Sequence, residues 1–289
     1  MSRFISIGLP ESGKTTYLAA LWHVLESREV HGALQLSALQ ADREYLNTIR
    51  DAWLSFSSVP RTLVPAGGIV FTLADEADSL LGTVEFPDLP GESFRAQWTE
   101  RQWSEDYDGL VRSADGVLLF VHPSVIEPRQ ISEADAALGS KARKRKAAAQ
   151  ELAWNPERSP TQAQAVELLQ FLAEAWQQSF PIPAAIIVSA WDRVAVLAEA
   201  TKSEEPTPAN WIAARLPLLS QFLRANPELF RTRIYGVSAQ GGDFEVSGDR
   251  ERMMDHVVTS DRIRVVGPDR VSHDPTSPLR WLMQQGQEP

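Results

Sequence analysis

A glycine-rich segment near the start of the chain constrains the fold more than any other feature. Residues 8–15 read Gly-Leu-Pro-Glu-Ser-Gly-Lys-Thr and match the pattern G-x-x-x-x-G-K-[ST]. The apolar run from Phe4 to Ile7 precedes this segment, and apolar residues at helical spacing follow it. The sequence therefore predicts a strand, a tight loop and a helix, in an order that turns backbone N–H groups and the positive end of the helix toward one point.

Such a loop can hold the phosphate groups of a nucleotide. The ammonium group of Lys14 can reach the terminal phosphates, and the hydroxyl group of Thr15 can bind Mg²⁺. A glycine-rich turn that only caps a helix is the alternative, but such a turn does not require a lysine followed by a threonine. The residues that we expect around the phosphates are Gly8, Glu11, Ser12, Gly13, Lys14, Thr15 and Thr16.

Strands alternate with helices along the rest of the chain. Two β-type runs flank a short polar turn and predict an antiparallel hairpin, and later unbroken apolar runs are typical of central strands. A helix that begins at Thr207-Pro208 either kinks or restarts at Pro217. This pattern predicts an α/β fold with a three-layer, doubly wound, mostly parallel sheet and one antiparallel edge hairpin strand. The expected strands are 68–74, 81–86, 116–121, 184–188 and 233–237, and the clearest helices are 40–56, 161–177 and 278–285.

The charge balance argues against general binding to nucleic acid or to an anionic membrane. The chain has 28 basic and 38 acidic residues and a net charge of −10. The run 141–146 is an exception, because five of its six residues are positively charged. It is either a solvated segment or a contact for an acidic partner or RNA.

The absence of cysteine limits the chemistry of the chain. It excludes disulfides, thiolate catalysis and cysteine-bound metals, and a reducing cytoplasm fits this composition best. No run approaches the roughly 20 apolar residues of a membrane span, and the N-terminal residues do not resemble a signal peptide. The histidines have no metal-ligand spacing, so we interpret them as ordinary surface or core residues: His23, His31, His122, His256 and His273.

Three further motifs follow predicted strands. Residues 88–91 read D-x-x-G, in which Asp88 can hold a magnesium-bound water and Gly91 can offer its N–H to the γ-phosphate. An Asp-Leu-Pro-Gly sequence is often an ordinary turn, so its value comes from its place after the hairpin. Ser189-Ala190-Trp191-Asp192 and Ser238-Ala239-Gln240 follow two later strands. Ligands of such sheets bind where the strands end.

In this order the motifs resemble those of Ras-like GTPases of the translation-factor-related class, from Phe4 to about Gln240. The resemblance implies GTP or GDP as ligand with Mg²⁺, and Asp192 as the residue that accepts hydrogen bonds from the guanine ring. Ala190 replaces the usual lysine, whose aliphatic stem packs over the base. Trp191 is either a stacking face for the base or a core residue. The base site implied by the resemblance comprises Ser189, Trp191, Asp192, Ser238, Ala239 and Gln240.

The chain is longer than a minimal Ras-like domain. We expect a single domain, 1–289, with a core of about 3–242, enlarged segments at 28–62 and 123–160, and a C-terminal extension, 243–289, that ends in a helix. The stretch 246–271 could add a hairpin. These additions are similar to those of bacterial double-GTPase proteins found with conflict or defence systems.

The resemblance also implies a catalytic arrangement. Thr62 is the best-placed threonine for Mg²⁺, and Arg61 beside it either stabilises charge on the transferred phosphoryl group or is a solvated loop residue. Together with Lys14, Glu92 is a catalytic candidate, at a position where this family often has a glutamine. A carboxylate at this position would repel the negatively charged γ-phosphate and raise the free-energy cost of bringing the two groups together, so hydrolysis should be slow.

These observations favour a GTP-dependent switch that acts on a regulatory or effector protein, such as a second GTPase. A P-loop ATPase or a small-molecule kinase remains open, because both use the same phosphate loop. A nucleotide-bound scaffold that does not hydrolyse its ligand is a third interpretation, which Glu92 and the enlarged segments favour.

Overall fold

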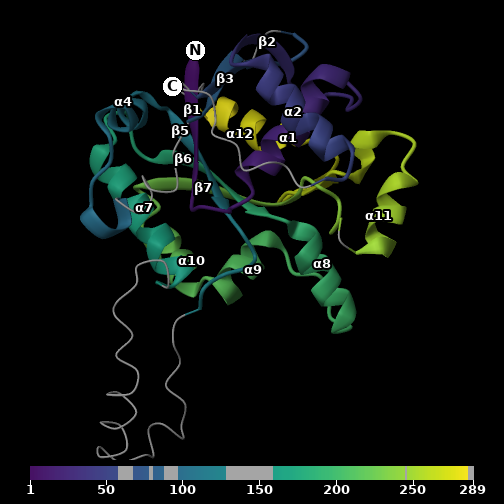
Figure 1. Ribbon diagram of the computed structural model, residues 1–289. Coiled ribbons are helices and arrows are strands. Elements are labelled where there is room, and N and C mark those ends of the chain that lie inside the picture. Colours follow the sequence, from purple (N-terminus) through teal and green to yellow (C-terminus); the bar gives the residue numbers. More distant parts are fainter. Residues whose placement is uncertain (58–67, 78–80, 88–96, 128–158, 245, 286–289) are drawn as a thin grey trace, which may run out of the picture.

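One sheet with helices on both faces organises the protein (Figure 1). The computed structural model describes residues 1–57, 68–77, 81–87, 97–127, 159–244 and 246–285. The strands are β1 (Ser2–Gly8), β2 (Gln35–Gln40), β3 (Ile69–Ala74), β4 (Leu81–Phe86), β5 (Gly116–Val121), β6 (Ile182–Ser189), β7 (Phe230–Ser238), β8 (Arg264–Val266) and β9 (Val271–Ser272). The helices are α1 (Lys14–Ser27), α2 (Arg43–Leu54), α4 (Glu105–Ser113), α7 (Thr161–Ala175), α8 (Trp191–Ala200), α9 (Pro208–Arg215), α10 (Pro217–Ala225), α11 (Ser247–Met254), the 3-10 helix η2 (Thr259–Arg262) and α12 (Ser277–Gln285).

The middle of the sheet is parallel. The strand order is β2-β3-β4-β1-β5-β6-β7-β8-β9, and β1 pairs in parallel with both β4 and β5. The strands β6 and β7 continue the parallel part, whereas β3 runs antiparallel to β4 at one side and β8 runs antiparallel to β7 at the other. The predicted doubly wound fold with an antiparallel edge hairpin is confirmed.

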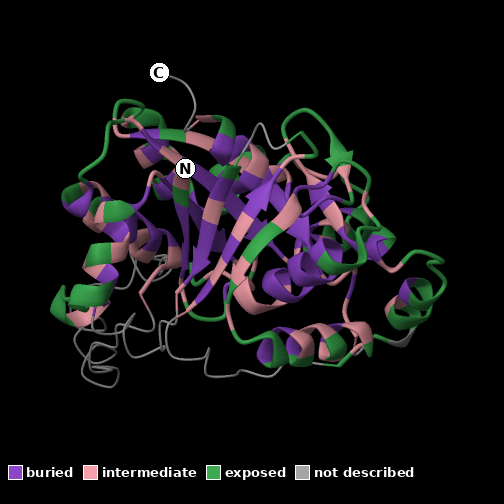
Figure 2. Ribbon diagram, turned by 90° about the horizontal axis from the view of Figure 1, so that it is seen from above, coloured by how far each residue is buried: buried purple, intermediate pink, exposed green. Residues whose placement is uncertain are grey.

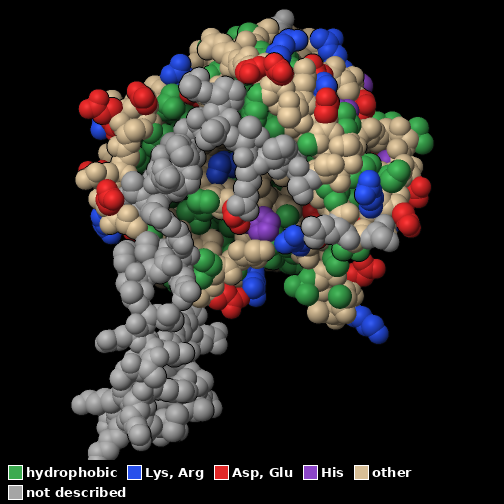
Figure 3. Space-filling view, viewed as in Figure 1, with side chains coloured by type: hydrophobic (Ala, Val, Ile, Leu, Met, Phe, Trp, Pro, Cys, Tyr) green, Lys and Arg blue, Asp and Glu red, His purple; other side chains and the backbone are tan. Residues whose placement is uncertain are grey.

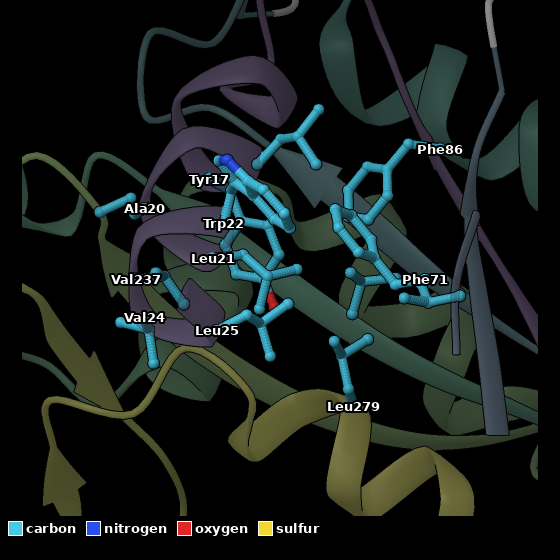
Figure 4. Packing of buried hydrophobic residues seen from close by; sticks show 14 of the residues in the cluster. Tyr17, Ala20, Leu21, Trp22, Val24, Leu25, Phe71, Phe86, Val237 and Leu279 are labelled. Carbon is cyan, nitrogen blue, oxygen red and sulfur yellow. The ribbon is translucent and has the colours of Figure 1, made fainter. Parts of the chain in front are cut away.

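One hydrophobic core lies on each face of the sheet, so the fold has three layers: helices, sheet and helices (Figure 2). Apolar side chains of α1, α2 and α12 pack on one face, and those of α4, α7, α9 and α10 pack on the other. Figure 4 shows the first core, in which Tyr17 and Trp22 of α1 point toward the same cluster as Phe71 of β3 and Leu279 of α12. All residues of β5 are buried, as the unbroken apolar run predicts.

The sequence interpretation missed the edge strand β2. Leu36 and Leu39 are three residues apart, which is not the spacing of a strand, yet both pack against the first core. A register shift between Leu36 and Ala38 explains this spacing, because an extra residue in an edge strand returns both side chains to one face. The predicted helix 40–56 is correspondingly shorter and begins after Asp42, whose carboxylate accepts hydrogen bonds from the backbone N–H groups of Glu44 and Tyr45.

The C-terminal part of the chain is built into the same sheet. The hairpin of β8 and β9 overlaps the end of the stretch 246–271, where one was considered, and α12 confirms the predicted closing helix. Pro217 restarts a helix: α9 ends at Arg215, and Leu216, with φ −132° and ψ 57°, separates it from α10. Within the described residues, no helix is long and apolar enough to span a bilayer.

A close contact between β7 and α8 shows how tightly the second core is packed. Gly236 faces the fully buried ring of Trp191, and a Cβ at this glycine would lie 2.3 Å from the indole. The indole Nε1–H also donates a 2.6 Å hydrogen bond to Glu205. Trp191 is therefore fixed in its position and cannot make room for a larger residue at 236.

We predict that Gly236→Ala lowers the free energy of unfolding by about 1–3 kcal/mol, because the added methyl group overlaps a rigid, buried ring. Gly109→Ala is the matched control, since nothing lies within 4 Å of a Cβ at this helical glycine. There alanine should stabilise the protein by about 0.5–1 kcal/mol. Urea unfolding of both variants measures the two effects, and equal midpoints would contradict the packing described.

Candidate nucleotide-binding site

The loop between β1 and α1 has the features of an anion site. Helix α1 begins at Lys14, and neither an acidic residue in its first turn nor a capping side chain occupies its N-terminal N–H groups. Inside the loop, Lys14 donates hydrogen bonds from Nζ to the backbone oxygens of Gly8, at 2.7 Å, and Leu9, at 3.1 Å. Its third acceptor is the Ser12 hydroxyl, at 3.3 Å. The loop therefore forms the compact turn that the sequence pattern predicts.

Gly13 brings this loop against the end of β6. Its φ of 87° lies in the left-handed region, and a Cβ would be 2.8 Å from both Cβ and Oγ of Ser189. Ser189 is buried and donates a hydrogen bond to the backbone oxygen of Val121 on β5. The phosphate loop is thus in direct contact with the first residue of the predicted base motif.

Burial changes the acid–base behaviour of the loop lysine. Removal from water lowers the pKa of Lys14 to about 7, because the charged form loses hydration. Negative phosphate groups near the ammonium would favour the charged form again. Nucleotide binding and the protonation of Lys14 should therefore be coupled.

A single pocket, which we call the base pocket, extends from the phosphate loop to the ends of β6 and β7. Four of the predicted base residues line it, and the start of α1 closes one side. Its lining residues are Glu11, Gly13, Thr16, Tyr17, His122, Ile187, Ser189, Ala190, Asp192, Arg193, Val237, Ala239, Gln240, Gly242 and Asp243. Motifs that are far apart in the sequence thus share one cavity.

Ser238 supports the carboxylate of the base pocket. Its hydroxyl group donates a 2.6 Å hydrogen bond to Oδ1 of Asp192 and accepts one from the backbone N–H of Gly241. Ser238 is almost fully buried and does not line the pocket itself. Its side chain therefore fixes Asp192 and the loop after β7, rather than meeting a ligand directly.

The structure corrects the assignment of Trp191 to the base site. The indole is fully buried in the second core, packs on Gly236 and is absent from the lining of the base pocket. A tryptophan at the first position of a helix can turn toward the sheet, and here the missing side chain at 236 provides the space. The alternative, a core tryptophan, is correct.

The enlarged parts of the chain meet at the loop after β7. Trp53 of α2 donates a hydrogen bond from Nε1 to the backbone oxygen of Ala239, at 2.9 Å. The guanidinium group of Arg262 lies 3.6 Å from the centre of the Trp53 ring and donates to its backbone oxygen. Burial lowers the pKa of Arg262 to about 10. A predicted base residue is therefore held by two segments that a minimal domain lacks.

His122 is a pocket residue that the sequence interpretation missed. It follows β5 directly and lines the base pocket with Glu11 and Asp192. In Figure 3, a hollow near the centre of the face brings histidine, basic and acidic side chains together. The position of His122 directly after a buried strand is a sequence signal for a residue at the ligand-binding edge of the sheet. The spacing between histidines tests only for a metal site and carries no information about a nucleotide contact.

Several predicted site residues lie outside the described residues: Arg61, Thr62, Asp88, Gly91, Glu92 and the basic run 141–146. Their roles remain predictions. Among the described residues, no group of three or more histidine or acidic side chains could hold a metal ion by itself. Thr15 lies in the first turn of α1, beside the loop, as a ligand to a phosphate-bound cation requires.

A comparison with solved structures finds a probable GTP-binding protein and the G domain of an iron transporter among the matches. The crystal structure of EngB, described as a probable GTP-binding protein, is 16% identical with a TM-score of 0.31, and the comparison covers 88% of this chain and 97% of that one. The G domain of the T. maritima FeoB iron transporter is 15% identical with a TM-score of 0.33, covering 88% and 98%. No curated protein matches the sequence.

Residues 5–282 match the sequence family DO-GTPase1, described as Double-GTPase 1. The match includes the phosphate loop, the base pocket and the C-terminal hairpin, and it confirms the predicted resemblance to GTPases. Because it spans most of the chain, the protein belongs to the Double-GTPase 1 family.

Proposed function

We propose that the protein is a GTP-dependent switch that binds GTP with Mg²⁺, hydrolyses it slowly and acts on a partner protein. The observation that carries the proposal is the base pocket, whose lining includes Gly13 of the phosphate loop and Thr16 of α1 together with Asp192. A carboxylate held by Ser238 can accept hydrogen bonds from the ring N–H and the amino group of guanine, which adenine does not present together.

Magnesium fits the donor set of this chain. Mg²⁺ keeps several waters and takes one or two protein oxygens together with nucleotide phosphates. Thr15 supplies a hydroxyl group beside the loop, and Thr62 and Asp88 are the further ligands that we propose. The bound cation would neutralise charge on the β- and γ-phosphates. Lys14 would hold the same phosphates from the protein side.

The switch acts through the segments that follow α2 and β4. In this proposal the γ-phosphate orders the segments around Thr62 and Gly91, and hydrolysis releases them. Arg61 and Glu92 adjust the rate of hydrolysis. The name of the family is consistent with a second GTPase as the regulatory or effector partner. The setting that we propose is a bacterial defence or conflict system in the cytoplasm.

The first prediction from this proposal concerns specificity for guanine. Asp192→Asn replaces an acceptor by a donor, so affinity for GTP should fall by about 100-fold, while affinity for XTP rises because xanthine carries an oxygen in place of the amino group. Lys14→Ala should weaken GTP and XTP alike. Titrations of GTP, XTP and ATP against the three proteins test this. Equal binding of ATP and GTP by the unaltered chain would favour an ATPase or a small-molecule kinase.

The second prediction concerns pH. Since the pKa of Lys14 is lowered to about 7 without ligand and phosphates raise it, GDP binding takes up a proton above that pH. Affinity is full below about pH 7 and should fall by up to about tenfold per pH unit above it. Calorimetric titrations from about pH 7 to about pH 8.5 measure the fall. Lys14→Arg, which stays charged, should show a flat profile, and equal profiles would refute the coupling.

The third prediction concerns hydrolysis. The purified protein should turn over GTP well below about once per second, because Glu92 places negative charge near the γ-phosphate. Glu92→Gln keeps the side-chain length, removes the charge and should increase the rate, whereas Glu92→Ala tests whether the side chain acts at all. Fast turnover that survives Glu92→Ala would exclude slow hydrolysis and this role. No turnover with any partner would favour a nucleotide-bound scaffold.

A further inference from the structure

His122 occupies the part of the base pocket between the phosphate loop and the base motif. It follows Val121, which pairs with Val188 of β6, so the histidine stands beside the strand end that carries Ser189 and Ala190. The charged groups that face it are Arg193 and Asp192 from α8 and Glu11 from the phosphate loop. The imidazole thus lies between the groups assigned to the two ends of a nucleotide.

A backbone contact fixes the orientation of the ring. The N–H of Ser124 donates a 3.1 Å hydrogen bond to Nδ1 of His122. In the neutral ring the proton is therefore on Nε2, which has no hydrogen-bonding partner among the described residues. Burial, helped by the charge of Arg193, lowers the pKa of His122, while Asp192 and Glu11 oppose this shift. At neutral pH the ring is an uncharged aromatic group with one N–H donor, at Nε2.

The base motif lacks a side chain that could pack over the base. Ala190 stands where the resembling GTPases have a lysine whose stem packs over the base, and Trp191 is fixed in the core. Neither residue can cover the nucleoside. We propose that His122 does so: its ring packs on the guanosine moiety, and Nε2–H donates to it. This inference rests on the proposed nucleotide site and names a residue that determines affinity for the nucleoside.

His122 could instead have a purely structural role in the turn at Ser124. Replacing it by asparagine distinguishes this role from a contact with the nucleoside. In His122→Asn, the side-chain oxygen can still accept from the N–H of Ser124, but the ring and the outward donor are lost. His122→Ala loses the ring and the donor, and it also loses the acceptor for the N–H of Ser124. If the ring covers the nucleoside, both variants should bind GDP about tenfold more weakly than the unaltered chain. If it only shapes the turn, His122→Asn should bind as the unaltered chain does.

Titrations of GDP and of inorganic pyrophosphate against the unaltered chain and the two variants test the inference. The unaltered chain is measured first, because a failure to bind GDP there refutes the proposed function and this inference together. Weaker GDP binding with unchanged pyrophosphate binding in both variants supports a nucleoside contact. Unchanged GDP binding by His122→Asn, or an equal loss for pyrophosphate, overturns it while the proposed function stands.

Histidine NMR provides a readout that a structural role would not move. The chain has five histidines, and loss of one signal in His122→Asn assigns the imidazole of interest. Addition of GDP should shift its Nε2 resonance and leave exposed His31 unchanged. An Nε2 resonance that stays in place at saturating GDP would overturn the contact.

Discussion

The contact between Gly13 and Ser189 is the constraint on which the site depends. It leaves no room for a side chain at 13, so the phosphate loop after β1 and the strand end of β6 have one relative position. Ser189 is tied in turn to Val121 of β5 by its hydroxyl group. Because three neighbouring parallel strands end at this edge, the two ends of a bound nucleotide meet groups whose spacing the sheet sets.

Segments that the sequence analysis interprets as additions to a minimal domain contact the base site. The loop after β7 receives a hydrogen bond from Trp53 of α2, and Arg262, just before β8, stacks on the same tryptophan. A buried cation between aromatic rings is costly to move, because its desolvated charge depends on those contacts. Helix α2 leads into the segment of Arg61 and Thr62, so one cluster links the base loop to the beginning of the proposed switch segment.

Local sequence patterns were sufficient to predict the parts of the site that are formed by short, continuous segments. The phosphate loop, the buried strands and the ends of β6 and β7 follow from apolar runs and adjacent polar residues. The errors arose where contacts between residues distant in the sequence determine the structure. A bulge puts Leu36 and Leu39 on one face and conceals β2, and Gly236 gives Trp191 its place in the core. The position of His122 after a buried strand indicates the edge of the sheet at which it lies, and the parallel pairing of β5 with β6 brings it into the base pocket.

Charge suggests how a nucleotide would enter this site. The chain carries a net charge of −10, and Glu11, Asp192 and Asp243 line the base pocket, so an uncompensated triphosphate meets repulsion on approach. Within the loop, the attraction comes from N–H groups and from Lys14, whose ammonium is only partly charged near neutral pH. If Mg²⁺ binds as we propose, a divalent cation on the phosphates would remove most of this repulsion, so we expect the magnesium complex rather than the free nucleotide to bind.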